Sequence, residues 1–361
     1  MDAGKIKETK LLETIHAHFF QKTVDGGVVL LKSYKSPWPG MADIELDNAK
    51  MLPLNGRFFT PIGKDGESGL YYPYFQLQSL DQWIESQQID REYTRKAFAI
   101  AKQLIQIIAQ LHKSKYLHGA INPHHVLIDN NDQLHLSEWT FLTDARKPRL
   151  LEKDRYLSMG MIHYIAPEQT GRYNVKPGYY TDMYGIGATL YKLFTGVVPF
   201  DGNDSMGIIY KHLTFEPIAA FERNPFMGKA LSGLISGLLN KDPQKRLMGS
   251  EAALFALEQA NQIFEKGDLD EELAIVGSVQ QQHFILTHHF PSVFENKATY
   301  FLSHYHQAAE GGECFLFFIE GVKGSGKQYA VNHFCERVAN KKNLVVDAIF
   351  LKDDPVPYDA F

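Results

Sequence analysis

The spacing of hydrophobic positions changes near residue 91. Before it, apolar runs predict strands at 27–32 and 69–77, with a short helix at 44–52 between them. After it, apolar residues recur every three or four positions from Phe98 to Leu111, which predicts a long amphipathic helix beginning at Arg91. We therefore expect a small strand-rich subdomain, residues 1–78, followed by a helical one, residues 79–264.

The helical part contains a segment, residues 181–195, that is apolar on nearly every face, which is typical of a buried helix. Thr181 or Asp182 is expected to cap its start, and Gly196 suits the left-handed position after its end. Further helices are predicted at 205–213, 229–240 and 250–265, before a charged linker at 265–282.

The last part of the chain, residues 283–361, predicts a strand at 314–319, a glycine-rich loop, a helix at 329–340 and a strand at 344–351. The loop fits G-x-x-x-x-G-K-[ST] except at its last residue, so it predicts a partial α/β P-loop NTPase unit. The candidate nucleotide-binding residues are Gly321, Gly324, Ser325, Gly326, Lys327 and Gln328.

The P-loop motif favours nucleotide binding over hydrolysis. Gln328 lacks the hydroxyl that normally ligates Mg²⁺, and no later strand supplies a Walker-B acid. We therefore expect the chain to be a fragment, a truncated gene product or a piece that needs a partner.

Composition narrows the classes of function. The 361 residues are 44% hydrophobic and 22% charged, and their formal charge of -5 argues against nucleic acid or an anionic membrane as the main partner. The two cysteines, Cys314 and Cys335, are too few for a disulfide framework and are not spaced for zinc. We expect no dedicated metal-ligating residues in this sequence. Because no signal peptide and no run of about 18 apolar residues occurs, we expect a cytoplasmic protein.

Four segments of the chain together resemble the protein kinase superfamily. Residues 116–128, YLHGAINPHHVLI, follow the long helix and resemble the catalytic loop H-R-D-L-x-x-x-N. Residues 166–168 match A-P-E, residues 181–187 resemble the start of the central C-lobe helix, and residues 241–246 resemble D-P-x-x-R. The resemblance implies an α+β bilobal protein-kinase-like fold. Its structural residues would be His118, Glu168, Asp182 and Arg246, with Glu168 paired to Arg246.

The motif His-x-x-Ile-Asn-Pro, together with residues 164–172, points to one group within the protein kinase superfamily. It resembles the N-terminal serine/threonine-kinase-like domain of large multidomain proteins, which join such a domain to an AAA-type ATPase and to a sensor histidine kinase. This resemblance implies other signalling proteins or domains as partners, and it leaves the oligomeric state open.

The residues that perform phosphoryl transfer in this family are altered here. The position of the catalytic carboxylate is Ala120, which cannot accept a proton. The metal-binding amide position is His125, and imidazole is a poor ligand for Mg²⁺. Glu138-Trp139-Thr140 stands where Asp-Phe-Gly is expected, so one carboxylate remains, and Met161 replaces the usual threonine. No glycine occurs between Thr14 and Asp25 to build a phosphate-covering loop.

Lys32 matches the lysine of V-A-I-K, and Glu45 is the candidate helix partner, with Asp47 as an alternative. A solvated strand lysine is the alternative for Lys32. The resemblance implies ATP as cofactor, held by Lys32, Glu45 and Glu138, and a weakened site for Mg²⁺. We favour the hypothesis of a pseudokinase that acts as a signalling scaffold. A weakly active serine/threonine kinase and a switch driven by the P-loop are the alternatives.

Overall fold

The computed structural model describes residues 9–273, apart from residues 15–16, 25, 36–39, 54–55, 148–160, 173–174 and 247–248. The chain divides into two compact units, Met1–Gln281 and Gln282–Phe361. The predicted P-loop and the strands and helix predicted around it, residues 314–351, lie outside the described residues. In the described part of the chain, no helix is both long enough and apolar enough to cross a membrane.

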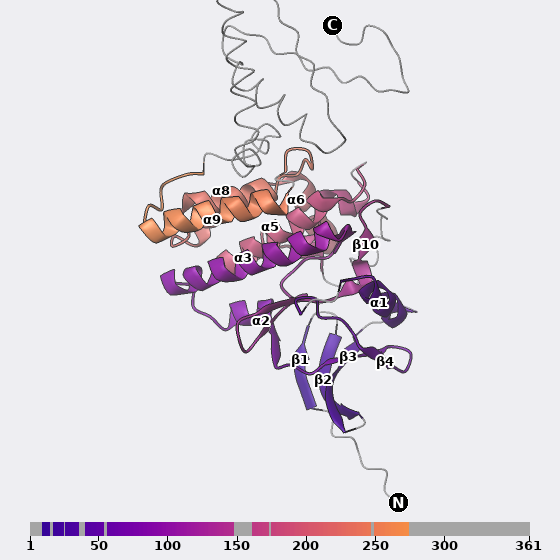
Figure 1. Cartoon of the computed structure of the whole chain (residues 1–361). Helices are drawn as coiled ribbons and strands as arrows, with labels where there is room; N and C mark the ends of the chain where they lie inside the picture. Colours follow the sequence, from indigo (N-terminus) through magenta and orange to yellow (C-terminus); the bar gives the residue numbers. More distant parts are fainter. Residues whose placement is uncertain are drawn as a thin grey trace, which may run out of the picture. The chain divides into compact units, whose positions relative to one another are not determined.

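The N-terminal lobe is a five-stranded antiparallel sheet in the order β1-β2-β3-β5-β4 with one helix, α1, beside it (Figure 1). Its register places Lys32 of β3 opposite Phe19 of β2 and Leu70 of β5. The elements are β1 (Thr9–Glu13), β2 (Ala17–Val24), β3 (Gly27–Tyr34), α1 (Met41–Lys50), β4 (Gly63–Asp65) and β5 (Gly69–Pro73).

The strand expected at 69–77 is two strands that belong to different sheets. Strand β5 ends at Pro73 and pairs with β3, whereas β6 (Leu77–Ser79) pairs with β8 in the second lobe. Residues 74–76 therefore connect the two lobes, and Phe75 among them is 43% exposed, so the apolar run is not one buried strand. Helix α1 begins at Met41, earlier than residue 44, directly after Gly40, whose φ of 76° is left-handed.

The C-terminal lobe is helical, and α5 lies at its centre. Helix α5 packs against α3 and α8, and α9 packs against both α3 and α8 (Figure 1). Nearly every residue of α5 is buried, as its sequence predicts. The helices are α2 (Leu80–Glu85), α3 (Arg91–Lys113), α5 (Tyr179–Thr195), α6 (Ser205–Thr214), α7 (Ala220–Arg223), α8 (Gly228–Leu238) and α9 (Ser250–Lys266).

Short strands and single turns between α3 and α5 carry the segments that resemble kinase motifs. Two small antiparallel sheets, β6-β8-β9 and β10-β7, place the catalytic loop between β7 and β8. These elements are β7 (Tyr116–Leu117), β8 (Val126–Asp129), β9 (Leu134–Leu136), η1 (Trp139–Phe141), β10 (Thr143–Asp144), η2 (Met161–Tyr164) and η3 (Pro167–Thr170).

The N-cap of the central helix is Gly178 rather than Thr181 or Asp182, although Thr181 bonds its backbone, and the predicted end is confirmed. Helix α5 begins at Tyr179 after Gly178, so Thr181 and Asp182 lie inside its first turn. The hydroxyl of Thr181 accepts from the N–H of Gly178 at 3.0 Å and donates to Glu168, whereas Asp182 accepts from the backbone of the catalytic loop. At the other end, Gly196 adopts a φ of 76°, and its N–H donates to the carbonyl of Lys192.

A fully buried ion pair joins η3 to the loop before α9. Two guanidinium nitrogens of Arg246 lie 2.7 and 3.0 Å from the two carboxylate oxygens of Glu168. Arg246 also donates to the carbonyls of Asn240 and Tyr180, at 2.9 and 2.7 Å. Because every one of these partners is protein, the pair fixes three segments of the C-lobe relative to one another.

We expect Glu168→Ala to lower the free energy of unfolding by about 3–5 kcal/mol, because it leaves the Arg246 charge buried without its carboxylate. Urea unfolding followed by tryptophan fluorescence would measure the change. Glu265→Ala, which removes the exposed partner of Arg95, is the matched control and should leave the midpoint where it is. Equal effects of the two substitutions would contradict the importance of the buried pair.

Candidate active site

Lys32 lies at the centre of the space between the two lobes. Its ammonium nitrogen is 2.6 Å from a carboxylate oxygen of Glu45 on α1 and 2.7 Å from one of Glu138 after β9. The residue is 2% exposed, and its nitrogen lies 4.4 Å from the centre of the Tyr34 ring. Lys32 is therefore a buried residue that joins β3, α1 and the C-lobe, and not a solvated strand lysine.

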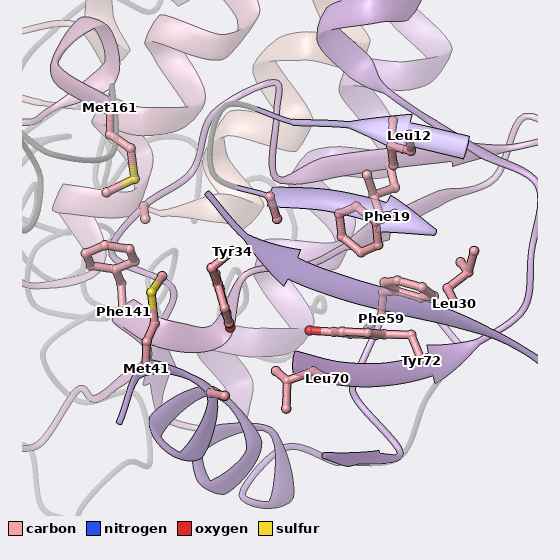
Figure 2. Close-up of a cluster of buried hydrophobic side chains, with 14 of the residues drawn as sticks. Leu12, Phe19, Leu30, Tyr34, Met41, Phe59, Leu70, Tyr72, Phe141 and Met161 are labelled. Carbon is pink, nitrogen blue, oxygen red and sulfur yellow. The ribbon is translucent and has the colours of Figure 1, made fainter. Parts of the chain in front are cut away.

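Glu45, rather than Asp47, is the partner of Lys32. Asp47 points to the surface, where it pairs with Lys50 at 2.8 Å. Glu45 is fully buried and also accepts hydrogen bonds from the phenols of Tyr34 and Tyr72. Figure 2 shows these two phenol oxygens pointing into the same space.

The electrostatics of this cluster follow from two carboxylates that share one ammonium. Burial alone would lower the pKa of Lys32, but Glu138 and Glu45 outweigh it and raise that pKa. Burial, with the nearby Glu138, raises the pKa of Glu45. Burial and the Glu45 charge also raise the pKa of the Tyr34 and Tyr72 phenols well above its usual range, so both phenols stay protonated and donate.

The start of the catalytic loop is held in place by Asp182 and by the ring of His118. Asp182 accepts from the backbone N–H groups of His118 and Gly119 at 2.9 and 2.8 Å, and it also lies 2.9 Å from the ring of His112. The ring of His118 donates from Nε2 to the carbonyl of Ser137 at 2.9 Å. Burial lowers the pKa of His118, which favours this neutral donor form.

Ala120, at the position of the catalytic carboxylate, belongs to an apolar cluster. Its neighbours in that cluster include Met161 and Phe141, and all three residues are buried. Figure 2 shows Met161 on the C-lobe side of this cluster and the aromatic side chains of the sheet on the other. An aspartate at position 120 would therefore place its carboxylate in an apolar cluster.

The two remaining candidate metal-binding positions are bonded to protein groups in this structure. His125 directs Nδ1 to the carbonyl of Ala120, 2.6 Å away. Glu138 uses one carboxylate oxygen for Lys32 and the other for the hydroxyl of Thr140, at 2.5 Å. Among the described residues, no group of three His, Cys, Asp or Glu side chains could hold a metal ion.

Apolar side chains from the N-lobe sheet and from the C-lobe form one buried cluster. Leu12, Phe19 and Leu30 of the N-lobe sheet join Leu127 of β8 in the same apolar cluster that contains Ala120. A cavity of about 230 Å³ lies beside these strands and is lined by Leu11, Leu12, Phe19, Leu30, Phe75, Gln76 and Leu77.

Several residues of the site have no sequence motif of their own. Tyr34, Tyr72 and Asn48 complete the polar contacts around α1 and the Glu138 segment. Gln169 donates to the carbonyl of Gly119 at 2.7 Å and so ties the A-P-E segment to the catalytic loop. Alternation along β3 could have indicated that Tyr34 shares a face with Lys32, whereas the other contacts depend on the tertiary fold.

Comparisons with known proteins agree with this geometry. The chain is 29% identical over 189 residues to the serine/threonine-protein kinase PrkC of Bacillus subtilis, a match that covers 51% of this chain and 28% of PrkC. It is 22% identical over 211 residues to the serine/threonine-protein kinase PksC of Streptomyces coelicolor, covering 56% of this chain and 38% of PksC. The chain therefore spans well under half the length of these relatives.

A shorter match concerns a multidomain protein. Over 89 residues the chain is 34% identical to the hybrid signal transduction histidine kinase G of Dictyostelium discoideum, covering 25% of this chain and 3% of that protein. The family model of the protein kinase domain matches residues 58–262, more than half of the chain. With the two-lobed fold and the buried Lys32–Glu45 pair, this match shows that the chain belongs to the protein kinase family.

Proposed function

We propose that this domain is a pseudokinase, a member of the serine/threonine kinase family that works by binding other signalling proteins rather than by transferring phosphate. One observation carries the proposal: Ala120 lies buried among apolar side chains at the position of the catalytic carboxylate. Phosphoryl transfer depends on positioned charges and metal ions, and a missing general base alone costs about 10²–10⁴-fold in rate.

The other altered positions support the same proposal. Met161 fills the space beside Ala120, and both oxygens of Glu138 are bonded to protein groups. An enzyme that had lost only its base would keep a free carboxylate for the metal. Here the neighbouring positions have changed with the base, which is what a fold retained for binding would show.

A second candidate function is a weakly active serine/threonine kinase that uses ATP. The assembled Lys32–Glu45 pair favours it, because kinases need this ion pair to position the phosphates. In such an enzyme Lys32 would have to exchange Glu138 for a phosphate oxygen. The two functions therefore differ in whether the contact at 2.7 Å between Lys32 and Glu138 opens.

The proposed role as a signalling scaffold rests on the relatives. The match to the hybrid signal transduction histidine kinase G supports a place in a multidomain signalling protein. We propose that the partners are other proteins or domains of such a system, and that the cytoplasm is where they meet. The nucleotide switch at residues 321–328 stays a prediction from the sequence alone.

Phosphoryl transfer from radiolabelled ATP and Mg²⁺ to casein or to the chain itself tests the proposal. We expect no transfer above that of Lys32→Ala, because neither a base nor a free metal ligand is in place. Ala120→Asp should restore no activity, since Met161, His125 and Glu138 remain. Sustained transfer by the wild-type chain that Lys32→Ala abolishes would overturn the proposal in favour of the weak kinase.

Thermal unfolding of the Lys327→Ala chain tests whether the kinase-like domain binds ATP and Mg²⁺. This variant lacks the lysine of the predicted P-loop, so that ATP binding at that loop contributes less to the measured shift. Ligand at 100 times its Kd stabilises a protein by about 2.7 kcal/mol, which is readily visible as a shift in Tm. We expect any shift caused by ATP to be the same with Mg²⁺ and with EDTA, because Glu138 is already committed to Lys32 and Thr140. A shift that needs Mg²⁺ would show a working metal site.

A further inference from the structure

His135 on β9 is buried and contacts a hydrogen-bond acceptor with each nitrogen of its ring. Nδ1 lies 2.8 Å from the backbone carbonyl oxygen of Gly56, in the loop after α1, and Nε2 lies 3.0 Å from a carboxylate oxygen of Asp129, at the end of β8. A carbonyl oxygen and an ionised carboxylate can only accept, so both ring nitrogens have to donate. Because a neutral imidazole carries one N–H and an imidazolium carries two, this geometry requires the charged ring.

Asp129 is held in its ionised form. Its other carboxylate oxygen accepts from the backbone N–H groups of Asn131 and Gln133, at 2.8 and 3.0 Å. Burial alone would raise the pKa of Asp129, but the hydrogen bonds from His135 and from these N–H groups outweigh it and lower that pKa. The carboxylate is therefore an acceptor, and the proton between the two side chains belongs to His135.

The ring of His135 joins segments of both lobes. Gly56 belongs to the N-lobe, whereas Asp129 and His135 belong to the small sheet of the C-lobe. The face of the ring stacks on Phe75, in the segment that connects the lobes, with ring centres 5.9 Å apart and 22° between the planes. Three segments that are distant in the chain therefore meet at one ring.

Besides Asp129, the segments around this ring carry the charged residues Arg57 and Asp132. The guanidinium of Arg57 binds the side-chain oxygen of Gln103 on α3 at 2.6 Å, and it stays charged throughout the pH range in which histidine titrates. Asp132 lies exposed in the turn between β8 and β9. A cavity of about 400 Å³ adjoins the ring, and of the described residues that line it His135 alone titrates.

We propose that His135 is a pH-sensitive clasp that holds the loop after α1 against the C-lobe while its ring is charged. Histidine changes charge between about pH 5 and pH 8, so a rise in pH across this range removes one of the two N–H groups. Either Gly56 or Asp129 then faces a ring nitrogen without a proton, and one contact is lost. The clasp is complete in mildly acidic solution and weakens as the pH rises. The inference goes beyond the proposed function, because it applies to a pseudokinase and to an active kinase alike.

Hydrogen–deuterium exchange of the full chain at about pH 6 and about pH 8 tests this proposal, with rates corrected for the intrinsic effect of pH on exchange. Residues 56–60 include the N–H of Phe59, which donates to the carbonyl of Leu136 on β9 at 2.8 Å. We expect the amides of this segment to exchange about tenfold faster at the higher pH, the ratio that corresponds to one lost hydrogen bond. His135→Gln, which cannot titrate, should abolish the difference. Helix α5, residues 179–195, should exchange at the same corrected rate at both pH values.

His163→Gln is the matched control. His163 is half-buried and donates from Nδ1 to the carbonyl of Phe200 at 3.1 Å, but it lies on η2, within the C-lobe. The pH difference at residues 56–60 should remain in this variant.

Asp129→Asn gives a second test that does not depend on the folding of His135→Gln. It keeps an oxygen that accepts from His135 but removes the charge that favours the imidazolium. Exchange measured in steps across the same pH range should therefore show the midpoint of the change at residues 56–60 at a lower pH. An unmoved midpoint would contradict the clasp.

Other results would also overturn the inference. Equal corrected exchange of residues 56–60 at the two pH values in the wild type would do so, as would a pH effect that survives in His135→Gln. So would an equal pH effect in α5, which marks general destabilisation rather than a local contact. Sustained phosphoryl transfer would refute the proposed function and leave the clasp untouched, so the two failures are distinguishable.

Discussion

The interlobe region of this chain depends on one buried ammonium, that of Lys32, held between Glu45 and Glu138. A charge this deeply buried is tolerated only when it is paired and hydrogen-bonded. Two carboxylates and the face of Tyr34 meet that requirement, and the phenols of Tyr34 and Tyr72 satisfy Glu45 in turn. Each of these partners comes from a different part of the chain, so burying Lys32 also fixes β3, α1 and the segment after β9 relative to one another.

The altered catalytic positions are consistent with this closed arrangement. In an active kinase the same lysine and the same carboxylate position would face phosphates and metal ions. Here Glu138 turns to Lys32 and Thr140, and Ala120 and Met161 contribute to an apolar cluster that reaches the N-lobe sheet. Both carboxylate oxygens of Glu138 are therefore bound by protein groups, and the apolar cluster also includes Phe19, Leu30 and Leu127.

The parts of the fold that lie far from the site follow the family closely. Glu168 and Arg246 brace the C-lobe, and Asp182 holds the catalytic loop through two backbone N–H groups. These interactions stabilise the fold whether or not phosphate is transferred, because none of them involves a substrate. A family match over residues 58–262 therefore establishes the fold and the ancestry of the domain, while the chemistry depends on the few positions that differ.

Hydrophobic periodicity by itself determined the long helix α3, the buried helix α5 and the change from a strand-rich to a helical lobe, since these patterns are local. The motif spacing likewise identified Lys32, Glu138 and the Glu168–Arg246 pair. Only the tertiary structure decided between Glu45 and Asp47, divided the strand expected at 69–77 between two sheets, and moved Asp182 from a helix cap to the catalytic loop. The physical reason is that each of these outcomes depends on which distant groups meet, and sequence spacing along one segment does not specify contacts between residues far apart in the chain.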